Sequence, residues 1–277
     1  MAGIAGIVCE LDESFQSFET CIKGHESRDA CRNCHFPTFA LKIARDNDKK
    51  RTGAGYSATT LLNCPRAVAL LSQYDYYEPA EALWNKIRGE LLHAAAEADP
   101  DPPAHVVRER RVRHTLEIEG EPVPLVVTGK ADEIDMSFEI ITDYKFVGSI
   151  PEDGKPDHEA QFNIYAWLCS VGHFVDTGKP VNLTIKGGGM HYLTLKRRKK
   201  RDGTIIKPWL KYRYPIWSNE RVEQLVIERL MPQVQFHQTG VLPTCDPFVK
   251  GRWDCECVKI TRQLTNRGIE VQEDHVL

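Results

Sequence analysis

The sequence predicts an α/β protein with a small cysteine- and histidine-rich appendage at its N-terminus. Three observations predict it. Residues 79–98 carry apolar side chains three and four apart, as in an amphipathic helix. Strand-like and helical segments alternate between residues 108 and 195. Four potential metal ligands fall within residues 21–34. With 277 residues, the chain can hold one large domain or a domain with an appendage.

The composition is that of an ordinary soluble protein, with 42% hydrophobic and 27% charged residues. No apolar run approaches the ~20 residues of a membrane span, and the start MAGIAGIVCELDES lacks the positive charge of a secretory signal. We therefore expect a cytoplasmic protein with no membrane partner. The net charge of −3 gives no overall indication of nucleic-acid binding, so any such binding must depend on local patches.

Residues 1–52 are predicted to form a separate module that holds zinc. Cys21, His25, Cys31 and Cys34 supply thiol and imidazole ligands in a C-x3-H-x5-C-x2-C arrangement, enough for one tetrahedral ion. The alternative is a helical arm with reduced thiols. The charged residues 44–51 and the glycines after them indicate a linker, which places the second domain at residues 53–277.

The next segment is predicted to be helical, with Ser57 as its N-cap and Cys64 inside as a small core residue. The amphipathic helix 79–98 follows. On it Gly89 and His93 are four residues apart and share a face, where the glycine would allow another backbone to approach the imidazole.

Three strand-like segments follow this helix: residues 108–118, the run that ends at Asp132, and residues 138–146. Asp143 and Lys145 are two apart on the last of these and point to the same face. If the preceding strands form a hairpin, Asp132 reaches the same place. Two carboxylates and an amine suit a divalent metal and a phosphodiester, although a cross-strand ion pair is the alternative.

A helix over residues 158–170 places Gln161 and Tyr165 on one face. Two further strands are expected, at 181–185 and 191–195, around flexible glycines at 187–189. A last long helix covers residues 219–237.

A basic run at residues 196–213 holds nine Lys or Arg against one acid, interleaved with aromatic residues. This composition suits phosphates and stacked single-stranded bases, and a solvated hairpin tip is the alternative. The candidate nucleic-acid-binding residues in it are Lys196, Arg197, Arg198, Lys199, Lys200 and Arg201.

Four short motifs occur in order along the chain: G-x3-H at Gly89–His93, G-x2-D at Gly129–Asp132, D-x-K at Asp143–Lys145, and Q-x3-Y at Gln161–Tyr165. Together they resemble the RecB-like branch of the PD-(D/E)XK nuclease superfamily over residues 56–259. The resemblance implies a restriction-endonuclease-like domain, a central mixed sheet flanked by helices.

The resemblance also implies roles for individual residues. His93, Asp132 and Asp143 would bind magnesium or manganese, the carbonyl of Tyr144 would complete the shell, and Lys145 would assist catalysis. Gln161 and Tyr165 would lie near the active site and the nucleic acid. Asp143 stands where many relatives carry glutamate.

The cysteines resemble those of an iron–sulfur subgroup that includes CRISPR-associated RecB-like nucleases and AddB-like helicase–nucleases. That subgroup has one cysteine before the nuclease core, here Cys64, and three after it, here Cys245, Cys255 and Cys257. The resemblance implies a four-iron four-sulfur cluster. The C-terminal spacing departs from the usual pattern, so zinc and independent thiols stay open.

The expected function is a metal-dependent nuclease, an exonuclease that acts on single strands or DNA ends in recombination, repair or phage DNA metabolism. The sequence contains no G-x4-G-K-[ST] motif, so unwinding would require a helicase or recombination protein as partner. The alternative function is a non-catalytic module that binds nucleic acid or a partner protein on the same fold.

Overall fold

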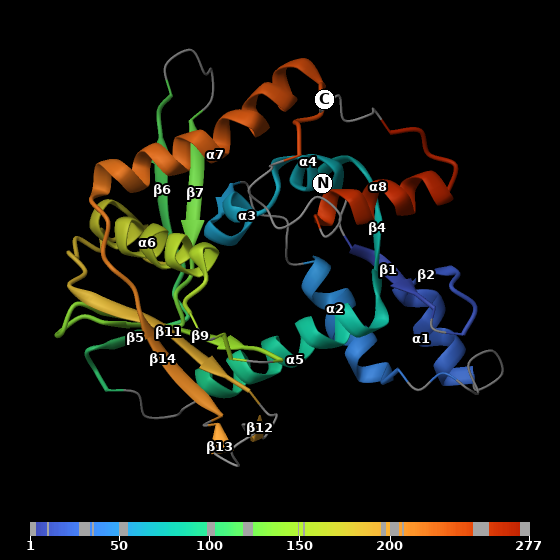
Figure 1. Ribbon diagram of the computed structural model, residues 1–277, viewed down its shortest axis with the longest axis horizontal. Coiled ribbons are helices and arrows are strands. Elements are labelled where there is room, and N and C mark those ends of the chain that lie inside the picture. The colour runs from blue at the N-terminus through green and yellow to red at the C-terminus, as the bar shows by residue number, and fades with distance from the viewer. Residues whose placement is uncertain are drawn as a thin grey trace. The chain divides into compact units, whose positions relative to one another are not determined.

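A computed structural model shows a mixed α/β protein with several sheets, which divides into two compact units (Figure 1). The first unit comprises residues 1–53, 63–91 and 231–277, and the second comprises residues 54–62 and 92–230. The structure describes residues 4–9, 11–27, 34, 36–49, 55–98, 103–118, 124–148, 150–151, 153–194, 198–199, 205–206, 208–245 and 255–271.

Part of the first unit is a three-stranded sheet in the order β2-β1-β4, with β1 antiparallel to β2 and parallel to β4. Helical side chains such as Phe18, Leu41 and Ile87 form a buried apolar cluster with Ile4 and Ile7 of β1. The elements are β1 (Ile4–Val8), β2 (Phe15–Ser17), α1 (Phe18–Ser27), α2 (Thr38–Lys49), β4 (Tyr76–Pro79) and the first part of α5 (Ala80–Glu97).

The rest of the first unit is helical. Helix α4 (Pro65–Gln73) packs against α8 (Glu256–Asn266), and their apolar side chains form a second buried cluster. The amide of Gln263 on α8 bonds both the N–H and the carbonyl of Tyr77 in β4, at 2.9 and 2.7 Å. These hydrogen bonds fix α8 to the sheet of the same unit.

The second unit contains a five-stranded mixed sheet in the order β14-β11-β9-β8-β5. Strands β9 and β11 are parallel, and α6 provides the crossover that such a pair needs. The neighbouring pairs are antiparallel. The elements are β5 (Val106–Arg108), β8 (Glu133–Asp135), β9 (Ile140–Phe146), α6 (Pro156–Val171), β11 (Gly187–Leu193) and β14 (Trp209–Arg213).

A second sheet of this unit has the order β10-β6-β7-β3. The chain passes from β5 to β6 and from β7 to β8, so one hairpin contributes to both sheets and changes direction between them. Other elements are β3 (Tyr56–Ser57), α3 (Ala58–Leu62), β6 (Val112–Leu116), β7 (Leu125–Gly129), β10 (His173–Phe174), the small pair β12 (Arg198–Lys199) and β13 (Ile205–Ile206), and α7 (Asn219–Thr239), whose last residues belong to the first unit.

Helix α6 lies at the centre of this unit's core, since every residue from Ala160 to Cys169 is buried. Its amphipathic character is correspondingly weak, as expected of a helix that is covered on all sides. The core continues into α7 through Val222, Val226 and Leu230.

The helix predicted after Ser57 is two helices, α3 and α4. Ser57 is the N-cap, because its Oγ accepts the backbone N–H of Thr60 at 3.0 Å. The helical conformation is interrupted at Cys64, and α4 begins at Pro65. A proline is favourable at this position because the N–H that it lacks would have no hydrogen-bond partner in the first helical turn.

The expected strand at 181–185 is wrong, and the glycines at 187–189 lie inside β11 rather than in a loop. A side chain at Gly188 would meet the carbonyl of Ile141 in β9, and one at Gly189 would meet the carbonyl of Tyr212 in β14. The glycines therefore allow two strands to approach β11 closely.

The strand predicted at 108–118 is also two pieces, β5 and β6. Glu109 separates them with a φ of 50°, a left-handed conformation that breaks an extended strand. In the described part of the chain, every helix is too short or too polar to cross a bilayer.

Candidate active site and cysteine cluster

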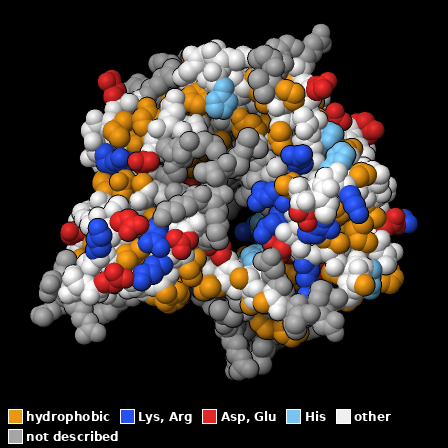
Figure 2. All heavy atoms as spheres, turned by 180° about the vertical axis from the view of Figure 1, so that it is seen from behind, with side chains coloured by type: hydrophobic (Ala, Val, Ile, Leu, Met, Phe, Trp, Pro, Cys, Tyr) orange, Lys and Arg blue, Asp and Glu red, His pale blue; other side chains and the backbone are white. Residues whose placement is uncertain are grey.

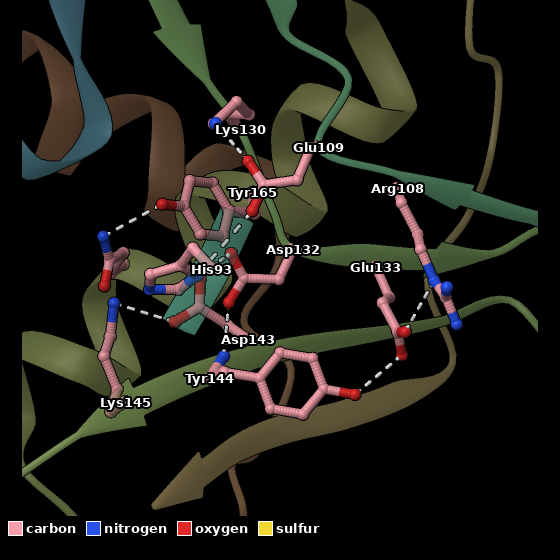
Figure 3. Close-up of polar contacts among 11 residues, drawn as sticks. His93, Arg108, Glu109, Lys130, Asp132, Glu133, Asp143, Tyr144, Lys145 and Tyr165 are labelled. Carbon is pink, nitrogen blue, oxygen red and sulfur yellow. Dashed lines mark hydrogen bonds and ion pairs between the residues drawn. The ribbon is translucent and has the colours of Figure 1, made fainter. Parts of the chain in front are cut away.

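Three side chains meet where the β5–β6 and β7–β8 connections change direction: His93 from α5, Glu109 after β5 and Asp132 before β8 (Figure 3). One ligand atom from each lies within 4.8 Å of the others. His93 Nδ1 is 3.0 Å from Asp132 Oδ1 and 3.6 Å from Glu109 Oε1. Imidazole and carboxylate form a ligand set that suits manganese or magnesium.

Glu109 was not among the residues predicted from the sequence. Its N–H donates to the carbonyl of Asp132 at 3.1 Å, which holds the two connections together. Its carboxylate is only 6% exposed and forms an ion pair with Lys130. An acid within the basic stretch RERR was the available signal, but the positive φ that turns it inward follows from the tertiary structure.

Asp143 and Lys145 extend this group along β9. Lys145 Nζ is 2.7 Å from Asp143 Oδ2, and the Asp143 side chain is only 3% exposed. The backbone N–H of Tyr144 donates to Asp132 Oδ2 at 2.5 Å. Asp132 therefore lies against the peptide between Asp143 and Lys145, and the four predicted residues His93, Asp132, Asp143 and Lys145 come together (Figure 3).

The ring of Tyr144 leaves β9 on the opposite face from Asp143. Its hydroxyl donates to Glu133 Oε2 at 3.0 Å, and Glu133 Oε1 accepts from Arg108 at 2.9 Å. These contacts hold the backbone of Tyr144, whose carbonyl is the predicted fourth ligand, from the side away from the acids.

Crowding of buried carboxylates changes the protonation of the site. Burial, and then the nearby charge of Asp143, raise the pKa of Asp132 to about 6, against the lowering effect of His93. Hydrogen bonds to Asp132 and Glu109 raise the pKa of His93 to about 9. Burial opposes ionisation of Glu109, but His93 and Lys130 outweigh it and hold its pKa at about 2. A divalent cation would offset this buried negative charge.

Gln161 and Tyr165 of α6 form a buried pair near the carboxylates of Asp132 and Asp143. Gln161 Nε2 donates to the Tyr165 hydroxyl and to Thr59 Oγ1, both at 2.9 Å, and both α6 side chains are buried. Burial, with the charges of Asp143 and Asp132, raises the pKa of Tyr165. Tyr165 therefore lies close enough to the two carboxylates for their charges to affect its pKa.

The two motif glycines differ in their surroundings. An added Cβ at Gly129 would lie 2.6 Å from Leu168 Cδ1 and 2.8 Å from Tyr165 Cδ1, so this position must be small for β7 to pack against α6. Among the described residues, an added Cβ at Gly89 meets no heavy atom within 4 Å. The expected close approach of a backbone at Gly89 is therefore wrong.

The basic run is described only in part. Lys196, Arg197, Lys200 and Arg201 lie outside the described residues, while Arg198 and Lys199 form β12, and only their backbone is described. Nearby, Tyr214 is buried and its hydroxyl bonds Tyr192, so it offers no surface for stacked bases.

In the first unit, the Sγ atoms of Cys64, Cys245, Cys255 and Cys257 all lie within 4.8 Å of one another. Cys64 is the residue before α4, Cys255 is the residue before α8 and Cys257 is in the first turn of α8. None of the four forms a disulfide, and all four lie in or against an apolar cluster. The four cysteines of the predicted cluster thus meet, although they come from positions up to 193 residues apart in the numbering.

Burial and contact with the other thiols raise the pKa of Cys245 and of Cys257 in the absence of metal. Burial raises the pKa of Cys245 to about 12, and a hydrogen bond with Cys64, together with burial, raises that of Cys257. Four thiols in an apolar site are the donor set of both tetrathiolate zinc and a four-iron cluster, and either group would have to displace the protons.

The predicted zinc module at residues 1–52 is tested only in part. Cys21 is buried in the apolar cluster of the first unit, and Cys34 packs against that cluster. His25 is in the last turn of α1. Cys31 lies outside the described residues, so this zinc site remains a prediction.

Among the solved structures that are similar to this chain is the one described as the crystal structure of SSO0001. The alignment has a TM-score of 0.51 and 20% sequence identity, and it covers 70% of this chain and 85% of that chain. This likeness concerns the fold. No protein-family model matches the sequence, and no curated protein matches it.

Proposed function

We propose that this protein is a metal-dependent nuclease of the RecB-like PD-(D/E)XK type, which hydrolyses DNA phosphodiester bonds in single strands or at DNA ends. The observation that carries the proposal is the meeting of His93, Glu109 and Asp132 within 4.8 Å, with the Asp143–Lys145 pair on the adjoining strand. These groups come from four separate segments of the chain: α5, the residues after β5, the residues before β8, and β9.

The chemistry follows from the types of group. His93, Glu109, Asp132 and Asp143 would hold Mg²⁺ or Mn²⁺, which supplies Lewis acidity and an activated water when bound. Lys145 has a flexible amine beside Asp143, where it can orient the attacking water or contact the scissile phosphate. Gln161 and Tyr165 would support the carboxylates from behind.

The connectivity of the second unit supports a restriction-endonuclease-like arrangement. The acids lie on a mixed sheet in which an antiparallel pair, β8 and β9, precedes the parallel crossover β9–α6–β11. Asp132 immediately precedes β8 and Asp143 is at the centre of β9, so the two motif acids lie on or next to neighbouring strands of this sheet.

A surface for the substrate strand is available on β14. Trp209, Lys211 and Arg213 alternate along this strand and are exposed, so an indole and two cations share one face. On the opposite face of the molecule, drawn in Figure 2, Lys and Arg side chains also gather in one region. Cations with an exposed aromatic ring suit a single-stranded nucleic acid.

End-labelled single- and double-stranded DNA tests the proposal, with Mg²⁺ or Mn²⁺ present and with chelator as blank. The native protein is expected to degrade at least one of these substrates. Asp143→Asn and Lys145→Ala should each reduce the rate by about a hundredfold or more, because they remove groups that act on the reacting phosphate. The position of the label also reports the polarity of cleavage.

Matched controls are exposed residues of the same types in the same unit. Asp176→Asn and Lys186→Ala alter side chains that are 59% and 72% exposed, and both should cleave at the native rate. Undiminished cleavage by the two site variants would refute the assignment. A metal-binding protein that cleaves none of these substrates would favour the non-catalytic binding module.

A further inference from the structure

We propose that the four-cysteine site binds a single tetrahedral Zn²⁺ ion, as a redox-inert structural centre, rather than a four-iron four-sulfur cluster. The spacing of the sulfur atoms points to this. Sγ–Sγ distances are 3.9 Å for Cys64–Cys245, 3.4 Å for Cys245–Cys255, 3.1 Å for Cys255–Cys257 and 3.3 Å for Cys257–Cys245.

A single zinc ion requires this spacing. With Zn–S bonds of about 2.3 Å, the edge of a regular tetrahedron of sulfurs is about 3.8 Å. In a four-iron cluster each thiolate binds a different iron at an outer corner of the cube, so the sulfurs lie much farther apart. No pair among the four ligand sulfurs exceeds 4.8 Å, which leaves room for one ion and not for a cube.

The site is built into packed helices that resist expansion. Cys64 immediately precedes α4, and Cys255 and Cys257 belong to the start of α8. These two helices pack against each other through side chains that are at most 1% exposed, including Leu70 and Ile260. Moving the sulfurs apart to accommodate a cube would require these helices to separate.

The short Cys255-x-Cys257 spacing in the sequence is consistent with two ligands to the same zinc ion. One residue between the two cysteines places both thiols at the same helix start, 3.1 Å apart. Two thiols so close can share one ion. They are poorly placed to bind different irons of a cube.

The backbone complements the charge of such a centre. Four thiolates around Zn²⁺ carry a net charge of −2. Both α4 and α8 begin at a cysteine, and neither helix has a side-chain hydrogen bond at its N-cap. The partial positive charge of each helix start is therefore directed toward the thiolates. The zinc would join α4 and α8 with the segment around Cys245 within the first unit.

Metal analysis of the full-length protein, purified without oxygen, tests the proposal. Mass spectrometry of the metals and a visible spectrum should show zinc, no stoichiometric iron and no broad absorption near 400 nm. Cys257→Ser should contain one zinc equivalent fewer than the native protein. The difference in zinc content between the two proteins is the readout, because residues 1–52 are predicted to hold a second zinc ion that the total content would include. Cys9→Ser, which alters a thiol outside the group, should retain the native content.

A second measurement does not depend on a variant that folds. The native protein is stripped with chelator and titrated with Co²⁺, which gives intense visible bands in a tetrahedral thiolate site. One equivalent should produce these bands and Zn²⁺ should abolish them. About four irons per chain with a brown colour, or a native protein that contains no metal and takes up neither Co²⁺ nor Zn²⁺ at these thiols, would overturn the proposal. Neither readout depends on nuclease activity.

Discussion

The backbone N–H of Tyr144 donates to Oδ2 of Asp132 at 2.5 Å, and this hydrogen bond joins two motifs that are twelve residues apart. One oxygen of Asp132 is occupied by β9, while the other faces His93 at 3.0 Å. Asp132 is therefore oriented before any metal binds, and five further properties of the protein can be tested.

Loss of the Asp132 carboxylate should remove the divalent ion. We expect Asp132→Asn to weaken Mn²⁺ binding at least tenfold in calorimetry, because one anionic ligand becomes neutral while its shape is kept. Asp176→Asn should bind Mn²⁺ as the native protein does. Equal Mn²⁺ affinity in all three proteins would place the catalytic ion elsewhere.

Glu109 should matter as much as the predicted acids, although it lies outside the recognised motifs. Glu109→Gln is expected to reduce Mn²⁺ affinity by about 10- to 100-fold, the range found when groups that surround or support a metal are altered. Glu117→Gln changes an exposed glutamate in the same unit and should have no effect. An unchanged affinity in Glu109→Gln would show that this carboxylate serves only to pair with Lys130.

Metal binding should release a proton at neutral pH. The pKa of His93 is about 9 without metal, so its ring is protonated at pH 7.5 and must lose a proton to become a ligand. Asp132, with a pKa of about 6, is already ionised. Mn²⁺ affinity should therefore rise about tenfold per pH unit between pH 7 and 9 and level off above that range.

Calorimetry in buffers of different ionisation enthalpy measures this proton directly, with about one released per ion at pH 7.5. His93→Asn should abolish the release, and His173→Asn, at an exposed histidine, should preserve it. A release of zero in the native protein would mean that His93 does not bind the ion.

Trp209 should contribute to binding of single strands. Stacking of a base on an aromatic ring contributes about 1–3 kcal/mol, so Trp209→Ala is expected to weaken binding of an oligonucleotide by about 5- to 150-fold. Fluorescence anisotropy in Ca²⁺, without cleavage, provides the measurement. Phe138→Ala removes another exposed ring, 67% accessible, and serves as the control. A native affinity in Trp209→Ala would exclude β14 as the contact surface.

Gly129→Ala should destabilise the second unit. The new methyl group would lie 2.6 Å from Leu168 and 2.8 Å from Tyr165, so we expect a loss of about 1–3 kcal/mol in the free energy of unfolding. Gly148→Ala adds a methyl group where no atom of the described residues lies within 4 Å. Denaturant unfolding compares the two, and an equal effect would show that β7 and α6 can move apart freely.

Some features of the fold were accessible from the sequence because they depend on local periodicity. The long helices α5, α6 and α7 lie where the sequence predicts helices, α5 follows the apolar spacing of its segment, and Ser57 caps α3 as its side chain predicts. Predictions from local sequence patterns were wrong where packing against a neighbouring strand determines the secondary structure. The three glycines at 187–189 look like a loop, but β9 requires Gly188 to be small and β14 requires Gly189 to be small.

The sequence by itself determined the chemical groups: one imidazole, two acids, an amine and a set of cysteines, in an order that suggested which of them belong together. The tertiary structure alone decided that Glu109 joins the acids, because its backbone turns inward only where two strand connections meet. It also decided the spacing of the four thiols, since two helices packed in three dimensions fix the distances between atoms that the sequence only orders.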